Sequence, residues 1–93
     1  MKLGYYFHIS DEYTLKHIKV YDFGFCTGKE EFEDMAKNSF NPSSTLKPSR
    51  LDDINLDLSE KIGEVSSGFL LSDNSILIYS EKIINGGDFN GQQ

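Results

Sequence analysis

The first stretch of the chain alternates between apolar and polar positions. Large apolar side chains take every second position: Leu3, Tyr5, Phe7 and Ile9. The positions between them are Lys2, Gly4, Tyr6 and His8. A period of two is typical of a half-buried strand, because successive side chains of a strand point to opposite faces. The pattern predicts a strand over residues 2–9, and the polar residues 10–12 predict a connection after it.

Residues 13–26 are rich in Tyr, Thr, Ile, Val and Phe, which favour strands. Their alternation changes phase along the segment, so a regular strand does not fit all of it. Bulges near Lys16–His17 and near Val20–Tyr21 would restore the register of a second strand. A short helical turn capped by Ser10 is the alternative for the start of this segment.

The clearest helical pattern covers residues 28–40. Four apolar residues share one face of a helix at this spacing: Phe32, Met35, Ala36 and Phe40. Thr27 followed by Glu30 matches a capping box at the start, and Pro42 ends the element. The polar residues 41–50 predict a loop.

Residues 51–63 fit two patterns. Leu51, Ile54, Leu58 and Ile62 have helical spacing, whereas Ile54, Leu56 and Leu58 alternate as in a strand. We favour a short helix that is capped by Ser49 and ends at Gly63.

Residues 64–84 indicate a hairpin with a two-residue turn at Asp73–Asn74. Both faces of this hairpin are apolar. One face can pack on a helix, and the other carries Leu70, Leu77 and Tyr79. In so short a chain we expect a second copy to cover this second face, which predicts a homodimer with these three residues at its interface. The remaining residues 85–93 have no periodicity and predict a frayed tail.

These elements predict an α+β fold in a single domain over residues 1–84. It is an antiparallel sheet of about four strands, formed by two hairpins, with one or two helices packed on one face. A length of 93 residues fits one domain.

Composition narrows the classes of function. With 15 Asp and Glu against 9 Lys and Arg, the formal net charge is -6, which argues against direct binding of nucleic acid. No apolar run is long enough to span a membrane, and no secretory signal is present, so we expect a cytoplasmic protein that does not bind membranes. The single cysteine, Cys26, excludes an internal disulfide.

Candidate chemistry is sparse. Cys26 with His8 or His17 suggests a nucleophile and base, but nothing in their spacing brings them together. Asp53, Asn55, Asp57 and Glu64 follow the ligand spacing of an EF-hand calcium loop, although Leu58 stands where the turn needs glycine. We therefore expect no catalysis, cofactor or metal. A calcium-binding module and a small enzyme that uses Cys26 remain alternatives.

The charge distribution is more informative. Residues 27–64 hold nine acidic and five basic residues, a net charge of -4. Six carboxylates recur at helical spacing and predict an acidic binding face: Glu30, Glu33, Asp34, Asp53, Asp57 and Glu60. Their spacing along a helix is comparable to that of phosphates along one DNA strand. The leading hypothesis is a non-catalytic protein-binding module, in its sharper form an inhibitor that mimics nucleic acid and binds a basic protein surface. A structural or assembly subunit that uses an apolar hairpin face is an alternative.

In size, acidity and lack of catalytic motifs the chain is similar to small acidic phage-encoded inhibitor proteins, which include anti-restriction and anti-CRISPR proteins. That resemblance implies inhibition of a partner in the host cytoplasm. It assigns no role to any single residue.

Overall fold

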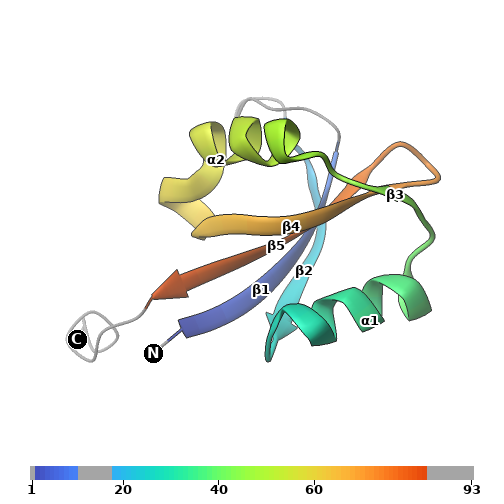
Figure 1. Cartoon of the computed structure of the whole chain (residues 1–93), viewed down its shortest axis with the longest axis horizontal. Helices are drawn as coiled ribbons and strands as arrows, with labels where there is room; N and C mark the ends of the chain where they lie inside the picture. Colours follow the sequence, from blue (N-terminus) through green and yellow to red (C-terminus); the bar gives the residue numbers. More distant parts are fainter. Residues whose placement is uncertain (1, 11–17, 84–93) are drawn as a thin grey trace.

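A computed structural model describes residues 2–10 and 18–83 of the chain (Figure 1). His17, the bulge expected at Lys16–His17, the helical turn considered after Ser10 and the tail expected over residues 85–93 lie outside the described residues.

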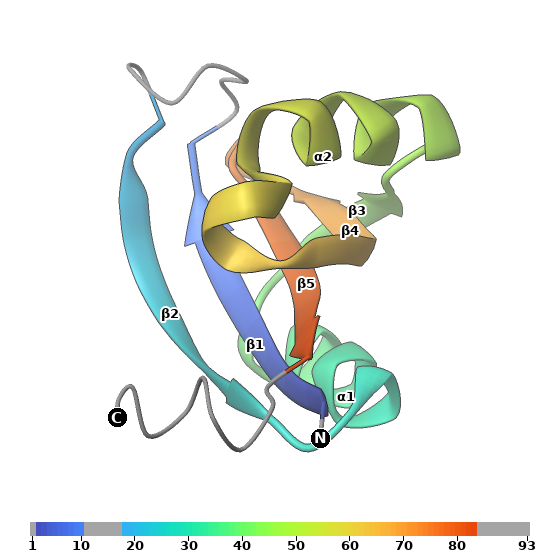
Figure 2. The ribbon, with the colours of Figure 1, turned by 90° about the vertical axis from the view of Figure 1, so that its left-hand side faces the viewer.

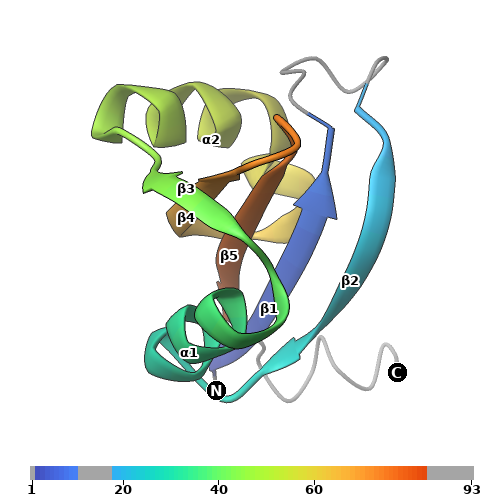
Figure 3. The ribbon, with the colours of Figure 1, turned by 90° about the vertical axis from the view of Figure 1, so that its right-hand side faces the viewer.

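The described residues form a five-stranded antiparallel sheet with two helices, which confirms the predicted α+β class. The strands are β1 (Lys2–Ile9), β2 (Val20–Cys26), β3 (Pro42–Thr45), β4 (Glu64–Leu71) and β5 (Ile76–Ile83), and the helices are α1 (Lys29–Ser39) and α2 (Pro48–Ile62). Their order across the sheet is β2-β1-β5-β4-β3, with β2 and β3 at the two edges (Figures 2 and 3).

The fifth strand, β3, lies in the segment that the sequence predicts to be a loop. It pairs with β4, with Thr45 opposite Phe69. Polar residues and a proline hide this strand from sequence analysis. A short edge strand tolerates both, because Pro42 stands at its first position and its side chains are largely exposed.

The helices lie on opposite faces of the sheet, so the expectation that both pack on one face is wrong (Figure 1). Ile54 and Leu58 of α2 pack in one cluster with Ile78. Phe32 of α1 packs in the other cluster with Tyr79. The central strand β5 is apolar on both faces and therefore needs a cover on each side, and each helix supplies one.

The β4–β5 hairpin differs from the prediction by one residue of register. Residues 72–75 connect the two strands, and a hydrogen bond from the Leu71 N–H to the Ser75 carbonyl at 2.9 Å closes a three-residue turn in which Asn74 adopts the left-handed conformation with a φ of 71°. Leu70 therefore pairs with Ile76 instead of Leu77. A shift of one residue moves every side chain of a strand to the other face.

The predicted exposed strip of Leu70, Leu77 and Tyr79 does not form, because the shift moves Leu70 to the other face and α1 covers the other two residues. Leu70 lies on the α2 side of the sheet, with the cluster around Ile54. Leu77 and Tyr79 are 0% and 1% exposed beneath α1. Buried side chains cannot form a contact with a second copy, and α1 takes the place that the prediction gave to that copy.

Both helices begin and end close to their predicted bounds. At the start of α1 the side chain of Glu31, not Glu30, accepts a hydrogen bond from the Thr27 N–H at 2.9 Å. Residues 51–63 are helical as favoured, but α2 already begins at Pro48, whose fixed φ suits a first helical turn. Gly63 ends α2 as predicted, with a φ of 93° that favours glycine.

The bulge expected near Val20–Tyr21 is confirmed. His8 pairs with Asp22 and Ile9 pairs with Val20, so Tyr21 has no partner residue on β1. The bulge restores the alternation, and Phe23 and Phe25 take the same face as Phe7 and Tyr5.

Candidate functional site

Four aromatic rings form a ladder on one face of β1 and β2. We call Tyr5, Phe7, Phe23 and Phe25 the aromatic face. Tyr5 stacks on Phe25 with ring centroids 5.5 Å apart, and Phe7 stacks on Phe23 at 6.1 Å. The exposed fractions of Phe23 and Phe25 are 65% and 66%, and Tyr5 and Phe7 are half-buried. Single exposed apolar residues are ordinary on protein surfaces, whereas contiguous exposed rings such as these are typical of an interaction site.

The ladder follows from strand pairing and from the position of α2. Tyr5 pairs with Phe25 and Phe7 pairs with Phe23, so the rings of both strands point to the same side. That side is also the α2 side, because Phe7 pairs with Ile78. However, α2 contacts β4 and β5, and β2 stands away from it at the edge of the sheet (Figure 2). The rings on β2 therefore remain uncovered.

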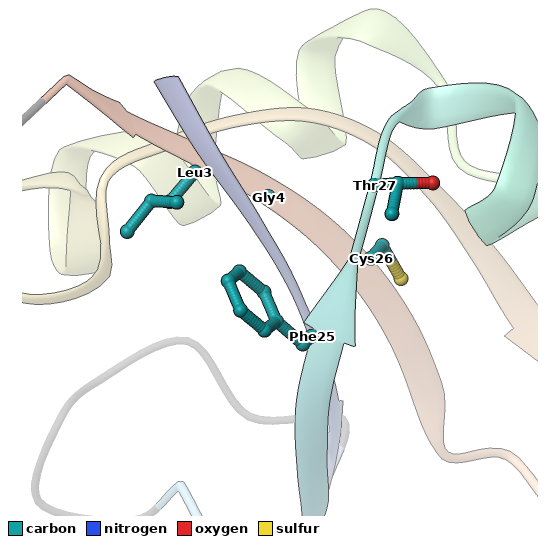
Figure 4. A pocket seen from close by; sticks show the side chains of 5 residues that line it. All are labelled: Leu3, Gly4, Phe25, Cys26 and Thr27. Carbon is teal, nitrogen blue, oxygen red and sulfur yellow. The ribbon is translucent and has the colours of Figure 1, made fainter. Parts of the chain in front are cut away.

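A shallow depression of about 280 Å³ continues the aromatic face at one end (Figure 4). Leu3, Gly4, Phe25, Cys26 and Thr27 line it. Leu3 and Phe25 lie on one side of β2, whereas the side chains of Cys26 and Thr27 lie on the other side (Figure 4). Most of the lining of the depression is apolar, so it adds an apolar end to the aromatic face.

The thiol of Cys26 is directed into the core beneath α1, where it packs with Phe32. Burial raises the pKa of the Cys26 thiol, and the charge of Glu31 raises it further. Both effects disfavour the thiolate, which is the nucleophilic form. Cys26 pairs with Gly4, and His8 lies four residues further along β1, a distance of about 13 Å along the strand. The structure therefore does not bring Cys26 and His8 together.

His8 takes part in a different contact. Its Nε2 lies 2.8 Å from Ser75 Oγ, and that hydroxyl donates to Asp73 Oδ1. Since a serine hydroxyl has one hydrogen, Ser75 accepts from His8 and cannot be activated by it as a base. The bond from Ser75 also lowers the pKa of Asp73, with a further contribution from His8. The three residues tie the β4–β5 loop to β1.

The residues of the EF-hand pattern do not form a calcium loop. Asp53, Asn55 and Asp57 lie within the continuous helix α2, and Glu64 begins β4. Among the described residues no group of three or more His, Cys, Asp or Glu side chains could hold a metal ion. Asn55 instead bonds the backbone of Val65, with its Nδ2 2.8 Å from the carbonyl oxygen and its Oδ1 2.7 Å from the nitrogen.

The six carboxylates of the predicted acidic face fall into two groups. Glu30, Glu33 and Asp34 belong to α1, and Asp53, Asp57 and Glu60 belong to α2. Because the helices lie on opposite faces of the sheet, the two groups do not share one surface (Figure 3). Within each group the side chains are exposed or half-buried.

No protein-family model, no curated protein and no solved structure matches this chain. Neither helix in the described part of the chain has the length and apolar content needed to cross a bilayer.

The sequence analysis missed the aromatic face. The signal was present, because Tyr5 and Phe7 alternate in one strand and Phe23 and Phe25 in the next. Alternation alone predicts that these rings share a face. It does not tell whether a helix covers that face, which depends on the placement of α2.

Proposed function

We propose that the protein is a non-catalytic protein-binding module and that the aromatic face is its binding site. The exposure of Phe23 and Phe25 carries the proposal. Water-exposed rings in a contiguous ladder contribute to stability less than buried ones would, so their presence is better explained by an interface. The centres of protein interfaces are enriched in aromatic residues and depleted in charged ones, as this face is.

An apolar protein surface is the partner that best fits this face. Single-stranded nucleic acid also stacks on exposed rings, but it needs a basic groove alongside them. The chain has a net charge of -6, and none of the four ring positions is next to a Lys or Arg on its own strand. Repulsion of phosphates therefore favours a protein partner over nucleic acid.

Capture from a lysate of the source cells, followed by reconstitution, tests the proposal. The bait proteins are the wild type, the double variant Phe23→Lys with Phe25→Lys, and a matched control, Leu56→Lys. Leu56 is 85% exposed on α2 and is not part of the aromatic face, so its replacement also adds positive charge and removes exposed apolar surface, but elsewhere on the protein. We expect a protein partner that the wild type and the control retain and the double variant loses.

Purified partner should then protect the rings of the aromatic face in a titration followed by NMR. Retention of the partner by the double variant would contradict the proposal. So would a captured ligand that proves to be single-stranded nucleic acid.

A second candidate is the acidic inhibitor, and α2 favours it. Asp53, Asp57 and Glu60 recur on one helix at intervals of four and three residues, and Asp53 and Glu60 are exposed. A row of this kind complements a basic surface such as a nucleic-acid-binding groove. This narrower form uses three carboxylates on one face of the molecule instead of six.

A further inference from the structure

β2 is an outer strand of the sheet that the described residues form (Figure 3). It is the longer of the two edge strands and contains no proline, whereas β3 has four residues and begins with Pro42. A long edge strand with free backbone groups is a template for pairing with another strand.

The register identifies which backbone groups of β2 point outward. Gly68 accepts a hydrogen bond from the Leu46 N–H, so its groups point away from β5. In an antiparallel pair of strands, the backbone N–H and C=O groups of two opposite residues either both point toward each other or both point away from each other. Applied along the pairs Gly68–Ile78, Ile78–Phe7 and Phe7–Phe23, this rule directs the N–H and C=O of Phe23 to the outer edge. Phe25, two residues further, points the same way.

The Phe23 N–H confirms this direction. It donates to Asp22 Oδ1 at 2.9 Å, and Asp22 Oδ2 accepts from the Tyr6 hydroxyl at 3.1 Å. The carboxylate of Asp22 thus occupies one of the two outward N–H donors, those of Phe23 and Phe25, and an incoming strand would have to displace this carboxylate.

The sequence of β2 is complementary to itself. The bulge at Tyr21 limits the regular part of the strand to residues 22–26, whose centre is Gly24. An antiparallel copy centred on Gly24 places Phe23 of one copy opposite Phe25 of the other, and the outward groups of both can exchange hydrogen bonds. Each Asp22 lies opposite a neutral Cys26, so the two carboxylates stand about 13 Å apart at the ends of the ladder.

We propose that two copies of this chain pair through β2, antiparallel and centred on Gly24. The pairing joins the two aromatic faces into one row of rings across four strands. The row runs from Phe7 on β1 to Phe23 on β2 of one copy, and continues to Phe25 on β2 and Tyr5 on β1 of the second copy. The inference deepens the proposed function and rests on it in one respect: the enlarged face is the proposed binding site. A five-residue strand contact is smaller than a standard interface, so we expect a reversible dimer with a Kd in the micromolar range.

Sedimentation velocity of the full chain from about 1 µM to about 1 mM tests the pairing, since this range spans micromolar Kd values. We expect the average mass to rise toward that of a dimer and the Phe23 and Phe25 amides to exchange more slowly with solvent as concentration rises. Phe25→Lys should raise the dimer Kd at least about tenfold, whereas Leu56→Lys should leave it unchanged. Asp22→Ala should lower the Kd, because it frees the Phe23 N–H and removes two charges from the interface.

A monomer throughout the concentration range would overturn the inference. A dimer that Phe25→Lys leaves intact, or that Asp22→Ala abolishes, would overturn it as well. Failure of the inference is distinct from failure of the proposed function: a monomer that still loses its partner in the double variant leaves the binding role standing. Conversely, a β2 dimer whose partner binds the double variant equally well leaves the pairing standing and refutes the role.

Discussion

Tyr79 is the residue whose surroundings most change its chemistry. Its ring lies 5.4 Å from that of Phe32 in the cluster beneath α1, and its hydroxyl donates to Glu81 Oε2 at 3.1 Å. Burial, as the largest cause, together with the hydrogen bond to Glu81 and the charge of Glu81 raises the pKa of Tyr79 to about 12. The phenol is therefore held in its neutral form well above the pH at which an ordinary tyrosine ionises.

This shift predicts a loss of stability in alkaline solution. A folded-state pKa above the unfolded value of about 10 stabilises the fold fully below pH 10, and the contribution is lost as pH rises toward 12. In a spectrophotometric titration, Tyr79→Phe should remove the last tyrosinate step. Glu81→Gln should move that step to lower pH without removing it, because burial remains. A last step unchanged in Tyr79→Phe would show that another tyrosine carries it.

At the scale of elements, Asn55 joins α2 to β4. Its side-chain amide donates to the carbonyl oxygen of Val65 at 2.8 Å and accepts from the N–H of Val65 at 2.7 Å. Val65 is buried, so water cannot replace those bonds. The asparagine that resembles a calcium ligand in the sequence thus has a structural role, which explains its polar character within an amphipathic helix.

We expect Asn55→Ala to lower the free energy of unfolding by about 2 kcal/mol or more, because it leaves a buried donor and acceptor unsatisfied. Urea denaturation measures the change. Asn38→Ala is the matched control, since Asn38 is exposed on α1 and its replacement should alter stability by less than about 0.5 kcal/mol. Equal effects of the two substitutions would mean that the Asn55 bonds contribute nothing net.

At the scale of the whole molecule, the sheet separates the two acidic groups. The residues of α1 and those of α2 lie on opposite faces, so one flat partner surface cannot contact both. Electrostatic steering by either group acts through its own face.

This separation predicts an asymmetric response to charge neutralisation. If the acidic inhibitor role holds, Asp53→Asn, Asp57→Asn and Glu60→Gln together should slow association with a basic partner and weaken its dependence on salt. The matched set Glu30→Gln, Glu33→Gln and Asp34→Asn removes the same charge from the opposite face and should have a smaller effect. Surface plasmon resonance at several salt concentrations, with duplex DNA as competitor, measures both. Equal effects of the two sets would indicate only a general influence of net charge.

The sequence determined the elements whose signals are local. The alternation of residues 2–9, the helical spacing around Phe32 and Ile54, the phase change near Tyr21 and the stop at Gly63 each predicted a feature that the structure contains. These signals depend on backbone geometry within a few residues, so a single sequence is enough to read them.

Only the tertiary structure decided which surfaces are covered. The strip of Leu77 and Tyr79 is buried, and the ladder of Phe23 and Phe25 is exposed, although both are equally apolar alternations in the sequence. The difference arises because one residue of turn register and the placement of each helix on its own face select the side chains that lose contact with water. The turn register and the placement of the helices depend on contacts between residues far apart in the chain, and the periodicity within one element does not predict such contacts.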